Sequence, residues 1–500
     1  MSKFIAVLDI GKTNKKTVIF DENLKQVHSE YKNFPGREID GLQTEDAEEA
    51  FNWFVGELAK LSKKYDIGAI SVTTHGATFA CTDKDFNLTI PVISYTNDPG
   101  EGFHKNFFAK YGDADKLHRE VGTANMGGLA NFGKGVEFVK TRFPDKFSKT
   151  VHIVNYPQYF GYMLTGKAAA EYTYAGNHSY LFNFKKKGWS RIADEMEIKD
   201  KLPKSIGKPH AVLGTITDEI AKKTGLSRDT IVTHGIHDSN ASYLPYLIKE
   251  KGKFILNSTG TWFVIMAGAK EASFSDQEIK AAVFCNANVY GDPVKTAVFM
   301  AGGELDLYRG LLKKYFNCDK HFDLNEKVYA KILSENSAFI LPGFLPGTGP
   351  FPDSTSRIIY EGKTYHVAEL DSKEKFPAFF NDPEYAYAAI TLSLAIQTTS
   401  MLQNVELSKG TRVFVEGGFR NNHAYCALLA ALSPDADVVL SDMSEATSFG
   451  SAIIAKSAMK GIPLEEIAND IIIRTEPVKK HNFKGLEEYR RKFLELLDYN

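Results

Sequence analysis

The chain has 500 residues, more than a single hydrophobic core usually supports, so two domains of roughly 200–250 residues each are expected. Its hydrophobic fraction of 43% and charged fraction of 24% exclude a largely disordered, collagen-like or low-complexity chain. The 60 lysines and arginines against 62 aspartates and glutamates disfavour nucleic acid as the main partner, because phosphate neutralisation requires an excess of basic residues.

The N-terminal segment lacks the apolar stretch and the small-residue cleavage site of a secretory signal. No run of about 18 apolar residues occurs anywhere, so we expect a soluble, cytoplasmic protein without a membrane partner. The four cysteines, at positions 81, 285, 318 and 426, form no CxxC pair, which predicts buried reduced thiols rather than disulfides or a zinc site. The sequence leaves the formation of a homodimer open.

The first half opens with β-rich runs at residues 4–8 and 17–20 and a third run after the turn at 21–23, which predicts a β-meander. Thr44 is expected to cap a following helix, whose apolar positions recur at helical spacing up to Tyr65. A buried strand at residues 69–74 then runs directly into His75 and Gly76.

The second half repeats this pattern. A strand at 253–257, a tight turn at 258–261 and a return strand at 262–266 form a hairpin, and Asp382 with Pro383 is expected to open a long helix. A strand at 412–415 then runs into glycines. We infer a diverged duplication into two α/β lobes with a cleft between them, divided after residue 248 near the charged segment 249–253, which could act as a hinge.

The first candidate site is the turn at residues 9–16, Asp-Ile-Gly-Lys-Thr-Asn-Lys-Lys. Such a turn points backbone N–H groups and hydroxyls outward, and its lysines add positive charge, which suits a terminal phosphate. Asp9 at the strand end could hold Mg²⁺ through water. The alternative is a plain β-hairpin turn without a ligand. The turn at 258–261 is of the same type, so the two turns could grip a polyphosphate from both sides.

Asp238 follows an apolar run and precedes a helix, where a carboxylate could act as a general base towards a hydroxyl group. An ordinary N-cap aspartate is the alternative. The glycines in residues 416–422 allow close backbone approach to adenine or phosphate, with a tight turn as the alternative. GxGxxG and Walker motifs are both absent from the sequence, which disfavours Rossmann and P-loop folds.

Taken in chain order, these motifs resemble those of the FGGY carbohydrate kinases of the actin-like ATPase superfamily. Further segments at 91–95, 164–167, 302–304 and 445–452 extend the similarity over nearly the whole chain. The central correspondences are residues 9–11 with Lys16 to the first phosphate loop, Asp238 to the catalytic base, 258–261 to the second phosphate loop, and Gly417, Gly418 and Asn421 to the adenosine loop.

The resemblance implies an α/β fold of two ribonuclease-H-like lobes, with residues 1–248 binding a small-molecule sugar and residues 249–500 binding ATP with Mg²⁺. Asp238 would be the catalytic base and Asp9 would position the metal. The sugar would contact His75, Gly76, Asp98, His237 and Asp238. The expected nucleotide-binding residues are Gly11, Lys12, Thr13, Asn14, Lys16, Thr259, Gly260, Thr261, Gly303, Gly417, Gly418, Phe419 and Asn421.

The substrate class is narrowed by the same comparison. The pair His237-Asp238 and the run 258–262 resemble kinases of 6-deoxy-ketohexoses such as L-rhamnulose and L-fuculose, whereas residues 74–77 resemble xylulokinases. A ketose is common to both. Three residues differ from those usual in the family, Lys12, Glu416 and Phe419. These differences could alter which nucleotide the protein prefers.

Two other classes of protein remain as alternatives. One is an actin-like protein that uses ATP to change the angle between its lobes without phosphorylating a sugar. The other is a catalytically silent sugar sensor with the kinase fold. Asp238 and the polar residues at several strand ends favour the enzyme, because a regulatory protein needs no general base.

Overall fold

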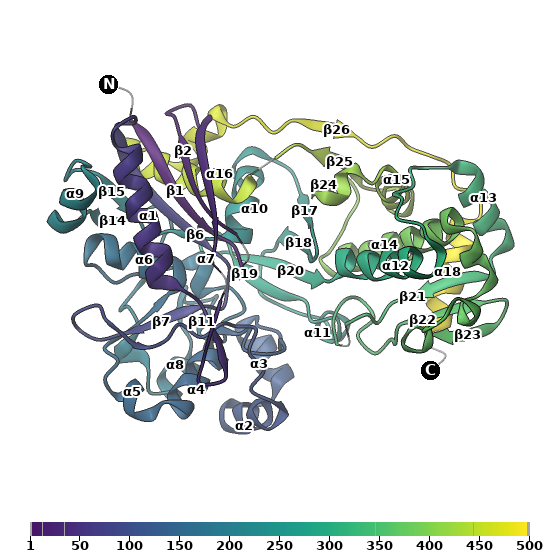
Figure 1. The fold of residues 1–500 in the computed structure, drawn as a ribbon, viewed down its shortest axis with the longest axis horizontal. Coiled ribbons are helices and arrows are strands. Elements are labelled where there is room, and N and C mark those ends of the chain that lie inside the picture. The colour runs from purple at the N-terminus through teal and green to yellow at the C-terminus, as the bar shows by residue number, and fades with distance from the viewer. Residues whose placement is uncertain (1–2, 13, 35, 346, 444, 498–500) are drawn as a thin grey trace.

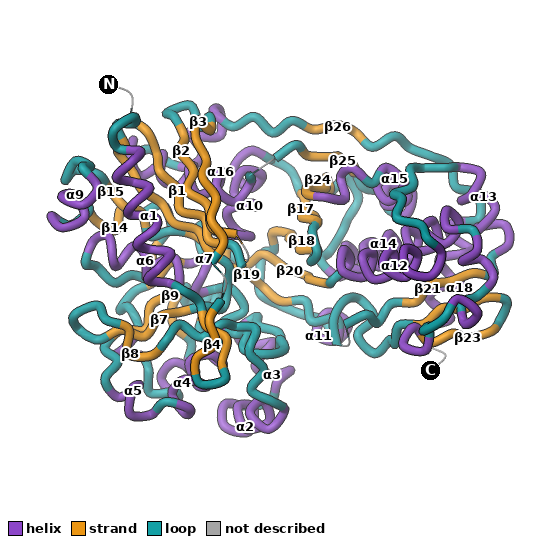
Figure 2. Tube along the Cα trace, in the orientation of Figure 1, coloured by secondary structure: helices purple, strands orange, loops and turns teal. Residues whose placement is uncertain are grey.

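The computed structural model describes residues 3–497 except residues 13, 35, 346 and 444, and its two lobes lie side by side (Figure 1). Each lobe contains a seven-stranded mixed sheet. Figure 2 shows helices and loops around the strands of both lobes. In the part of the chain described, no helix combines the length and apolar content needed to span a bilayer.

The first sheet confirms the predicted β-meander. Its strands follow the order β14-β15-β6-β1-β2-β3, with β16 also paired to β6. The first three strands are antiparallel neighbours, and β6 runs parallel to β1. The strand bounds are β1 Phe4–Ile10, β2 Asn14–Phe20, β3 Gln26–Asn33, β6 Ile67–Thr74, β14 Val212–Thr215, β15 Ile231–Thr233 and β16 Ile236–His237.

The second sheet has the order β19-β20-β18-β17-β24-β25-β26. Its central part β20-β18-β17-β24-β25 repeats β3-β2-β1-β6-β15 of the first sheet with the same strand directions, which confirms the predicted duplication. The strand bounds are β17 Phe254–Thr259, β18 Phe263–Gly268, β19 Phe284–Ala287, β20 Pro293–Phe299, β24 Arg412–Gly417, β25 Asp437–Ser441 and β26 Thr475–Pro477.

Smaller sheets and helices complete the first lobe. The strands are β4 Arg37–Ile39, β5 Leu42–Thr44, β7 Phe79–Thr82, β8 Leu88–Ile90, β9 His152–Asn155, β10 Ala170–Glu171, β11 Phe182–Asn183, β12 Gly188–Trp189 and β13 Ile206–Gly207. The helices are α1 Ala47–Leu61, α2 Glu101–Tyr111, α3 Ala114–Val121, α4 Phe132–Arg142, α5 Pro144–Ser148, α6 Tyr156–Thr165, α7 Tyr172–Ala175, α8 Arg191–Glu195, α9 Asp218–Thr224 and α10 Asp238–Lys249.

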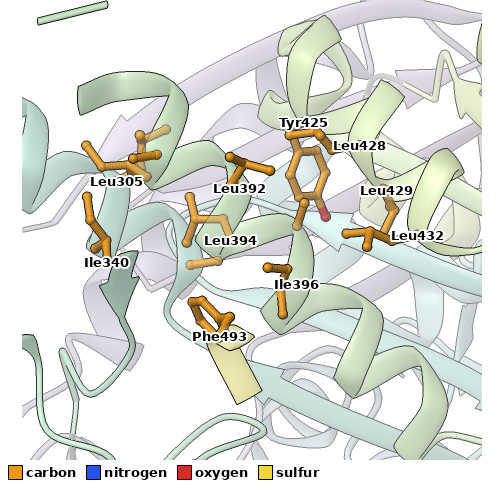
Figure 3. Packing of buried hydrophobic residues seen from close by; sticks show 14 of the residues in the cluster. Leu305, Ile340, Leu392, Leu394, Ile396, Tyr425, Leu428, Leu429, Leu432 and Phe493 are labelled. Carbon is orange, nitrogen blue, oxygen red and sulfur yellow. The ribbon is translucent and has the colours of Figure 1, made fainter. Parts of the chain in front are cut away.

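The helices that follow are α11 Asp276–Lys280, α12 Ala301–Phe316, α13 Glu326–Glu335, α14 Pro383–Asn404, α15 His423–Leu432, α16 Ala446–Lys460, α17 Leu464–Ile467 and α18 Leu486–Leu497. A small sheet holds β21 Ala338–Leu341, β22 Arg357–Tyr360 and β23 Lys363–His366. Helix α14 is buried along nearly its whole length, as its apolar sequence predicts. Figure 3 shows Leu392, Leu394 and Ile396 of this helix packed in the core of the second lobe.

Two predictions about local structure are wrong in detail. Thr44 ends β5 and donates a hydrogen bond to the Arg37 carbonyl, while α1 begins after Asp46, whose side chain makes no capping bond. Strand β17 continues through Thr259, because Ser258 and Thr259 pair with both neighbouring strands, so the turn begins only at Gly260. The prediction for α14 is confirmed, since Asp382 caps it by accepting a hydrogen bond from the Tyr385 amide.

Helix α16 lies against the first sheet although it comes from the C-terminal part of the chain. Its residues Ala452 and Ile453 share a buried cluster with Ile5 and Val7 of β1. The yellow helix accordingly lies beside the purple strands in Figure 1. This placement brings the start of α16 to the end of β1, where the first candidate site lies.

The cysteine prediction is confirmed for three of the four residues. All four thiols are free, and those at positions 81, 285 and 426 are buried. Cys318 is only half-buried, because it follows the exposed end of α12.

Candidate active site

The first part of the site is the carboxylate of Asp9 at the end of β1. Asp9 is only 3% exposed and lies opposite Lys16 in the β1–β2 register, with 3.2 Å between Lys16 Nζ and Asp9 Oδ2. Ser448 in the first turn of α16 donates a hydrogen bond of 2.5 Å to the same oxygen. Lys16 also forms an ion pair with Glu445. Both ends of the chain therefore supply partners for one buried carboxylate.

The pKa values of this cluster follow from burial and charge. Burial raises the pKa of Asp9, which the Lys16 ammonium and the Ser448 hydroxyl oppose, while the charge of Asp238 adds to the increase. Burial alone would lower the pKa of Lys16, but Asp9 and Glu445 outweigh it and raise that pKa. Lys16 is therefore charged at neutral pH and balances the two acids beside it.

Gly11 and Lys12 of the first turn, predicted to face a phosphate, bind other parts of the protein instead. The Gly11 amide donates to the Asn14 carbonyl at 3.0 Å, which closes the hairpin. Lys12 forms an ion pair with Glu45, donates to Ser94 Oγ at 2.5 Å and lies 5.2 Å from the centre of the Tyr95 ring. Its charge is thus already neutralised away from the turn. Thr13, another expected nucleotide contact, lies outside the described residues.

The second part of the site is Asp238, the first residue of α10. His237 occupies the N-cap position, so the alternative role of Asp238 as an N-cap is wrong. Asp238 Oδ1 accepts a hydrogen bond of 2.6 Å from the Ser239 amide and lies 3.1 Å from His237 Nε2. The Asp238 side chain is 30% exposed, so its carboxylate stays accessible to a ligand.

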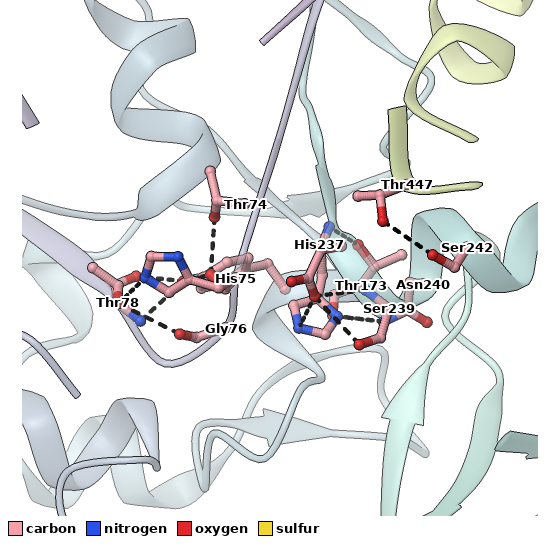
Figure 4. A network of polar contacts seen from close by, with 12 residues as sticks. Thr74, His75, Gly76, Thr78, Thr173, His237, Ser239, Asn240, Ser242 and Thr447 are labelled. Atoms are coloured by element: carbon pink, nitrogen blue, oxygen red, sulfur yellow. Dashed lines mark hydrogen bonds and ion pairs between the residues drawn. The ribbon is translucent and has the colours of Figure 1, made fainter. Parts of the chain in front are cut away.

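The tautomer of His237 follows from its neighbours. Asn240 Nδ2 lies 3.4 Å from the Thr173 carbonyl oxygen, which only accepts hydrogen bonds, so the amide nitrogen must face it. The same nitrogen lies 3.1 Å from His237 Nδ1, which therefore acts as an acceptor. Burial lowers the pKa of His237 to about 3, so the ring is neutral and its proton is on Nε2. The Nε2–H group of His237 thus donates to Asp238. Figure 4 shows His237 together with Ser239 and Thr173.

Two opposing effects act on the pKa of Asp238. Burial raises it above the usual 3.8, and the interaction with His75 and the two hydrogen bonds from Ser239 oppose that increase. A carboxylate with a raised pKa is a stronger base, while the N–H donors hold it ionised and oriented.

His75, Gly76 and Asp98, expected to bind sugar, are placed differently from one another. Both ring nitrogens of His75 have protein partners, the Ile10 carbonyl at 3.2 Å and Thr78 Oγ1 at 3.0 Å. Gly76 lies beside His237. Asp98 is exposed and accepts a hydrogen bond from the Gly100 amide. Gly76 and His237 are therefore together, whereas His75 is occupied by structural bonds and Asp98 lies at the surface.

A cavity of about 560 Å³ lies in the second lobe beside the β17–β18 turn. The cavity is open at Gly418, because a methyl group added there by substitution with alanine would meet no atom within 4 Å. Predicted nucleotide contacts on its wall are Gly260, Thr261, Gly418, Phe419 and Asn421, and further lining residues include Gly302, Arg309 and Tyr387.

The remaining predicted contacts hold the loops around this cavity. Thr259 Oγ1 donates to the Glu416 carbonyl and accepts from the Phe419 amide, which joins β17 to the loop after β24. Gly417 has a positive φ of 83°, and a methyl group there would overlap the Thr259 backbone. The Gly303 amide donates to the Thr261 carbonyl at 3.2 Å. These three residues shape the cavity without being part of its lining.

The residues present fit ATP and Mg²⁺. The cavity offers apolar walls from Phe419 and Leu305 beside glycines without side chains, which suits a flat base and phosphates. Asp9 supplies a buried carboxylate oxygen, the ligand type that Mg²⁺ prefers directly or through water.

Two residues that contact the candidate site, Ser448 and Asn240, were missed in the sequence. Ser448 lies in a segment that resembles the family, but nothing local links it to Asp9, which is 439 residues away. The contact between Asn240 and His237 could have been inferred from their spacing, because residues three positions apart on a helix lie on the same face.

Comparison with known proteins identifies the fold and the family. The model of the N-terminal domain of the FGGY family of carbohydrate kinases matches residues 4–244, and that of the C-terminal domain of FGGY carbohydrate kinases matches residues 251–462. A rhamnulokinase of Oceanobacillus iheyensis is 22% identical over 438 residues, covering 86% of this chain and 85% of that protein.

Solved structures show the same architecture. A carbohydrate kinase from Novosphingobium aromaticivorans superposes with a TM-score of 0.81 at 22% identity, covering 100% of this chain and 99% of the other. A ligand-bound xylulose kinase from Lactobacillus acidophilus gives 0.79 at 20% identity, covering 99% and 97%. The expected α/β fold with two ribonuclease-H-like lobes is thereby confirmed.

Proposed function

The chain belongs to the FGGY family of carbohydrate kinases, and on this premise we propose that it transfers the γ-phosphoryl group of ATP to the terminal hydroxyl of a ketose. The carrying observation is Asp238, whose carboxylate is partly exposed, raised in pKa and oriented by His237 Nε2–H. A group of this kind can orient a sugar hydroxyl and take its proton as it attacks phosphorus.

The other residues have supporting roles in this proposal. Asp9 and Lys16 position the metal and the transferring phosphate at the first lobe. The turn at Gly260 and Thr261, together with Gly418 and Asn421, binds the nucleotide in the cavity of the second lobe. When bound, Mg-ATP supplies the phosphoryl group and the metal charge that stabilises it during transfer. Residues 1–248 would thus bind mainly sugar and residues 249–500 mainly ATP.

For the substrate, we propose a 6-deoxy-ketohexose such as L-rhamnulose or L-fuculose. The His237-Asp238 pair and the similarity to a rhamnulokinase over most of the chain support this choice. A pentulose such as xylulose is the alternative, favoured by the Thr-His-Gly-Ala run at residues 74–77 and by the structural similarity to a xylulose kinase.

The test is an ADP-release assay with Mg-ATP against L-rhamnulose, L-fuculose, D-xylulose, L-xylulose, L-ribulose, D-ribulose, glycerol and gluconate, with a control lacking sugar. We expect strong release with one ketose. Asp238→Asn, of nearly the same shape, should lower kcat by at least about a thousandfold while ATP binding, measured by calorimetry, persists.

Two outcomes would contradict the proposal. Release equal to the sugar-free control throughout, from folded protein that binds ATP, would favour a silent sensor or an actin-like regulator. Loss of ATP binding together with activity in Asp238→Asn would show that Asp238 supports the fold and not the chemistry.

A further inference from the structure

A buried amide without hydrogen-bond partners lies next to the proposed base. Asn177 follows the short helix α7 and is only 2% exposed. Neither its Oδ1 nor its Nδ2 has a hydrogen-bond partner among the described residues. An unpaired buried amide destabilises the folded protein, so its presence calls for an explanation such as a ligand that completes its hydrogen bonds.

The amide is directed at Gly76. A methyl group on Gly76 would overlap Asn177 Nδ2, and it would lie 3.0 Å from His237 Nε2 and 3.2 Å from His178 Nε2. Three side-chain nitrogens thus surround one point that only glycine leaves free. One of them, His237 Nε2, is the atom that donates to Asp238.

The chain is strained where it presents these groups. His178 has a φ of 34°, in the left-handed region that non-glycine residues avoid, and its carbonyl is held by Asn131 Nδ2 at 3.0 Å. Backbone strain together with unpaired polar atoms at one place is typical of a ligand-binding segment.

We propose that Asn177 determines sugar specificity by binding a hydroxyl group close to the one that Asp238 deprotonates, with His178 as its neighbour beside Gly76. The inference rests on the proposed kinase function and deepens it. An amide with a free donor and a free acceptor can satisfy both on one hydroxyl or on two adjacent ones. A sugar that lacks this hydroxyl would leave the buried amide unpaired and would be rejected.

The charges of these residues would also select against a charged sugar. Burial lowers the pKa values of His178 and His237 to about 3, so both rings are neutral at physiological pH. Asn177 carries no charge either, and Asp238 is an acid. A sugar with a carboxylate at this end, such as gluconate, would find no cation among these four residues, so they favour an uncharged polyol.

The test compares wild type with Asn177→Leu, which has a similar volume and forms no side-chain hydrogen bonds. Calorimetry measures binding of the best ketose of the panel and of its analogue lacking the hydroxyl next to the reacting one. We expect Asn177→Leu to bind the ketose at least tenfold more weakly and to lose the discrimination between the two sugars. Its melting temperature without sugar should equal or exceed that of wild type, because an unpaired polar group has been removed.

Controls separate this inference from the proposed function. Asn183→Ala removes an amide of the same segment whose Oδ1 accepts a hydrogen bond from the Lys186 amide at 2.9 Å, and it should leave sugar binding unchanged. If Asn177→Leu does not fold, Asn177→Asp keeps the shape without the N–H donor and gives the same comparison. Unchanged sugar selectivity in a folded Asn177 variant would overturn the inference alone, whereas a wild type that binds ATP but no sugar would overturn both proposals.

Discussion

Ser448 donates a hydrogen bond of 2.5 Å to Asp9, although the two residues stand 439 positions apart in the chain. The bond forms because α16 packs against β1 and brings its first turn to the end of that strand. The same turn begins beside Glu445, which pairs with Lys16. The orientation of the proposed metal-positioning carboxylate therefore depends on how a C-terminal helix docks on the first lobe.

Ser448→Ala should weaken the use of Mg-ATP. Loss of the hydroxyl removes a hydrogen bond to a charged group, so we expect the KM for Mg-ATP to rise about tenfold, equivalent to about 1.4 kcal/mol. Thr447→Val is the matched control, because Thr447 Oγ1 contacts Ser242 Oγ at 3.1 Å. Steady-state kinetics at varied Mg-ATP measures both variants. An equal effect in both would show that only helix packing matters.

His237→Phe should change the pH dependence of catalysis. The His237 N–H stabilises ionised Asp238, so its removal should raise the pKa of Asp238 further and move the acid limb of kcat/KM to higher pH, by about one unit. His234→Phe is the control, since the His234 ring lies against Gly207. A uniform loss of activity with an unmoved acid limb would argue that His237 contacts only the sugar.

The adjacent glycines Gly417 and Gly418, in the proposed nucleotide-binding loop at the end of β24, should respond to substitution in opposite ways. Gly417→Ala should lower the free energy of unfolding by about 3 kcal/mol, because a methyl group at φ 83° overlaps the Thr259 carbonyl. Gly418→Ala should leave stability unchanged and raise the KM for Mg-ATP, because its methyl group enters the cavity. Thermal unfolding and kinetics measure both effects, and equal stability of the two variants would refute this account.

His118 should make the protein sensitive to acid. Its Nε2 contacts the Val283 carbonyl at 2.6 Å, and burial lowers its pKa to about 4. In the unfolded chain the pKa of His118 is near 6.5, so between pH 6.5 and pH 4 the unfolded state binds more protons than the folded state. The free energy of unfolding therefore falls as the pH falls through this window.

Protonation of His118 in the unfolded chain should lower the free energy of unfolding by about 2 kcal/mol at pH 5 relative to pH 7. His118→Gln keeps a donor for Val283 without titrating, so its free energy of unfolding should depend on pH less steeply by that amount. Denaturant unfolding at both pH values measures the difference. Identical pH dependence in wild type and variant would show that His118 does not titrate on unfolding.

The sequence allowed prediction of the features that depend on near neighbours. The β1–β2–β3 meander, the cap of α14 at Asp382 and the position of Asp238 at the start of α10 follow from alternation, turn residues and capping chemistry over a few residues. The order of the motifs also indicated the family. Thr44 shows the limit of local signals, because the pairing of β5 with β4 outweighs a capping pattern.

The sequence by itself determined the two-lobed fold and the candidate residues of the site, because strand alternation, glycine turns and helix caps are encoded within a few residues. Only the tertiary structure decided where side chains point. It joined Ser448 to Asp9, turned Lys12 towards Glu45 and set Asn177 against Gly76. Each of these contacts depends on the packing of distant elements, and burial in that packing then determines which groups carry charge and which lack partners.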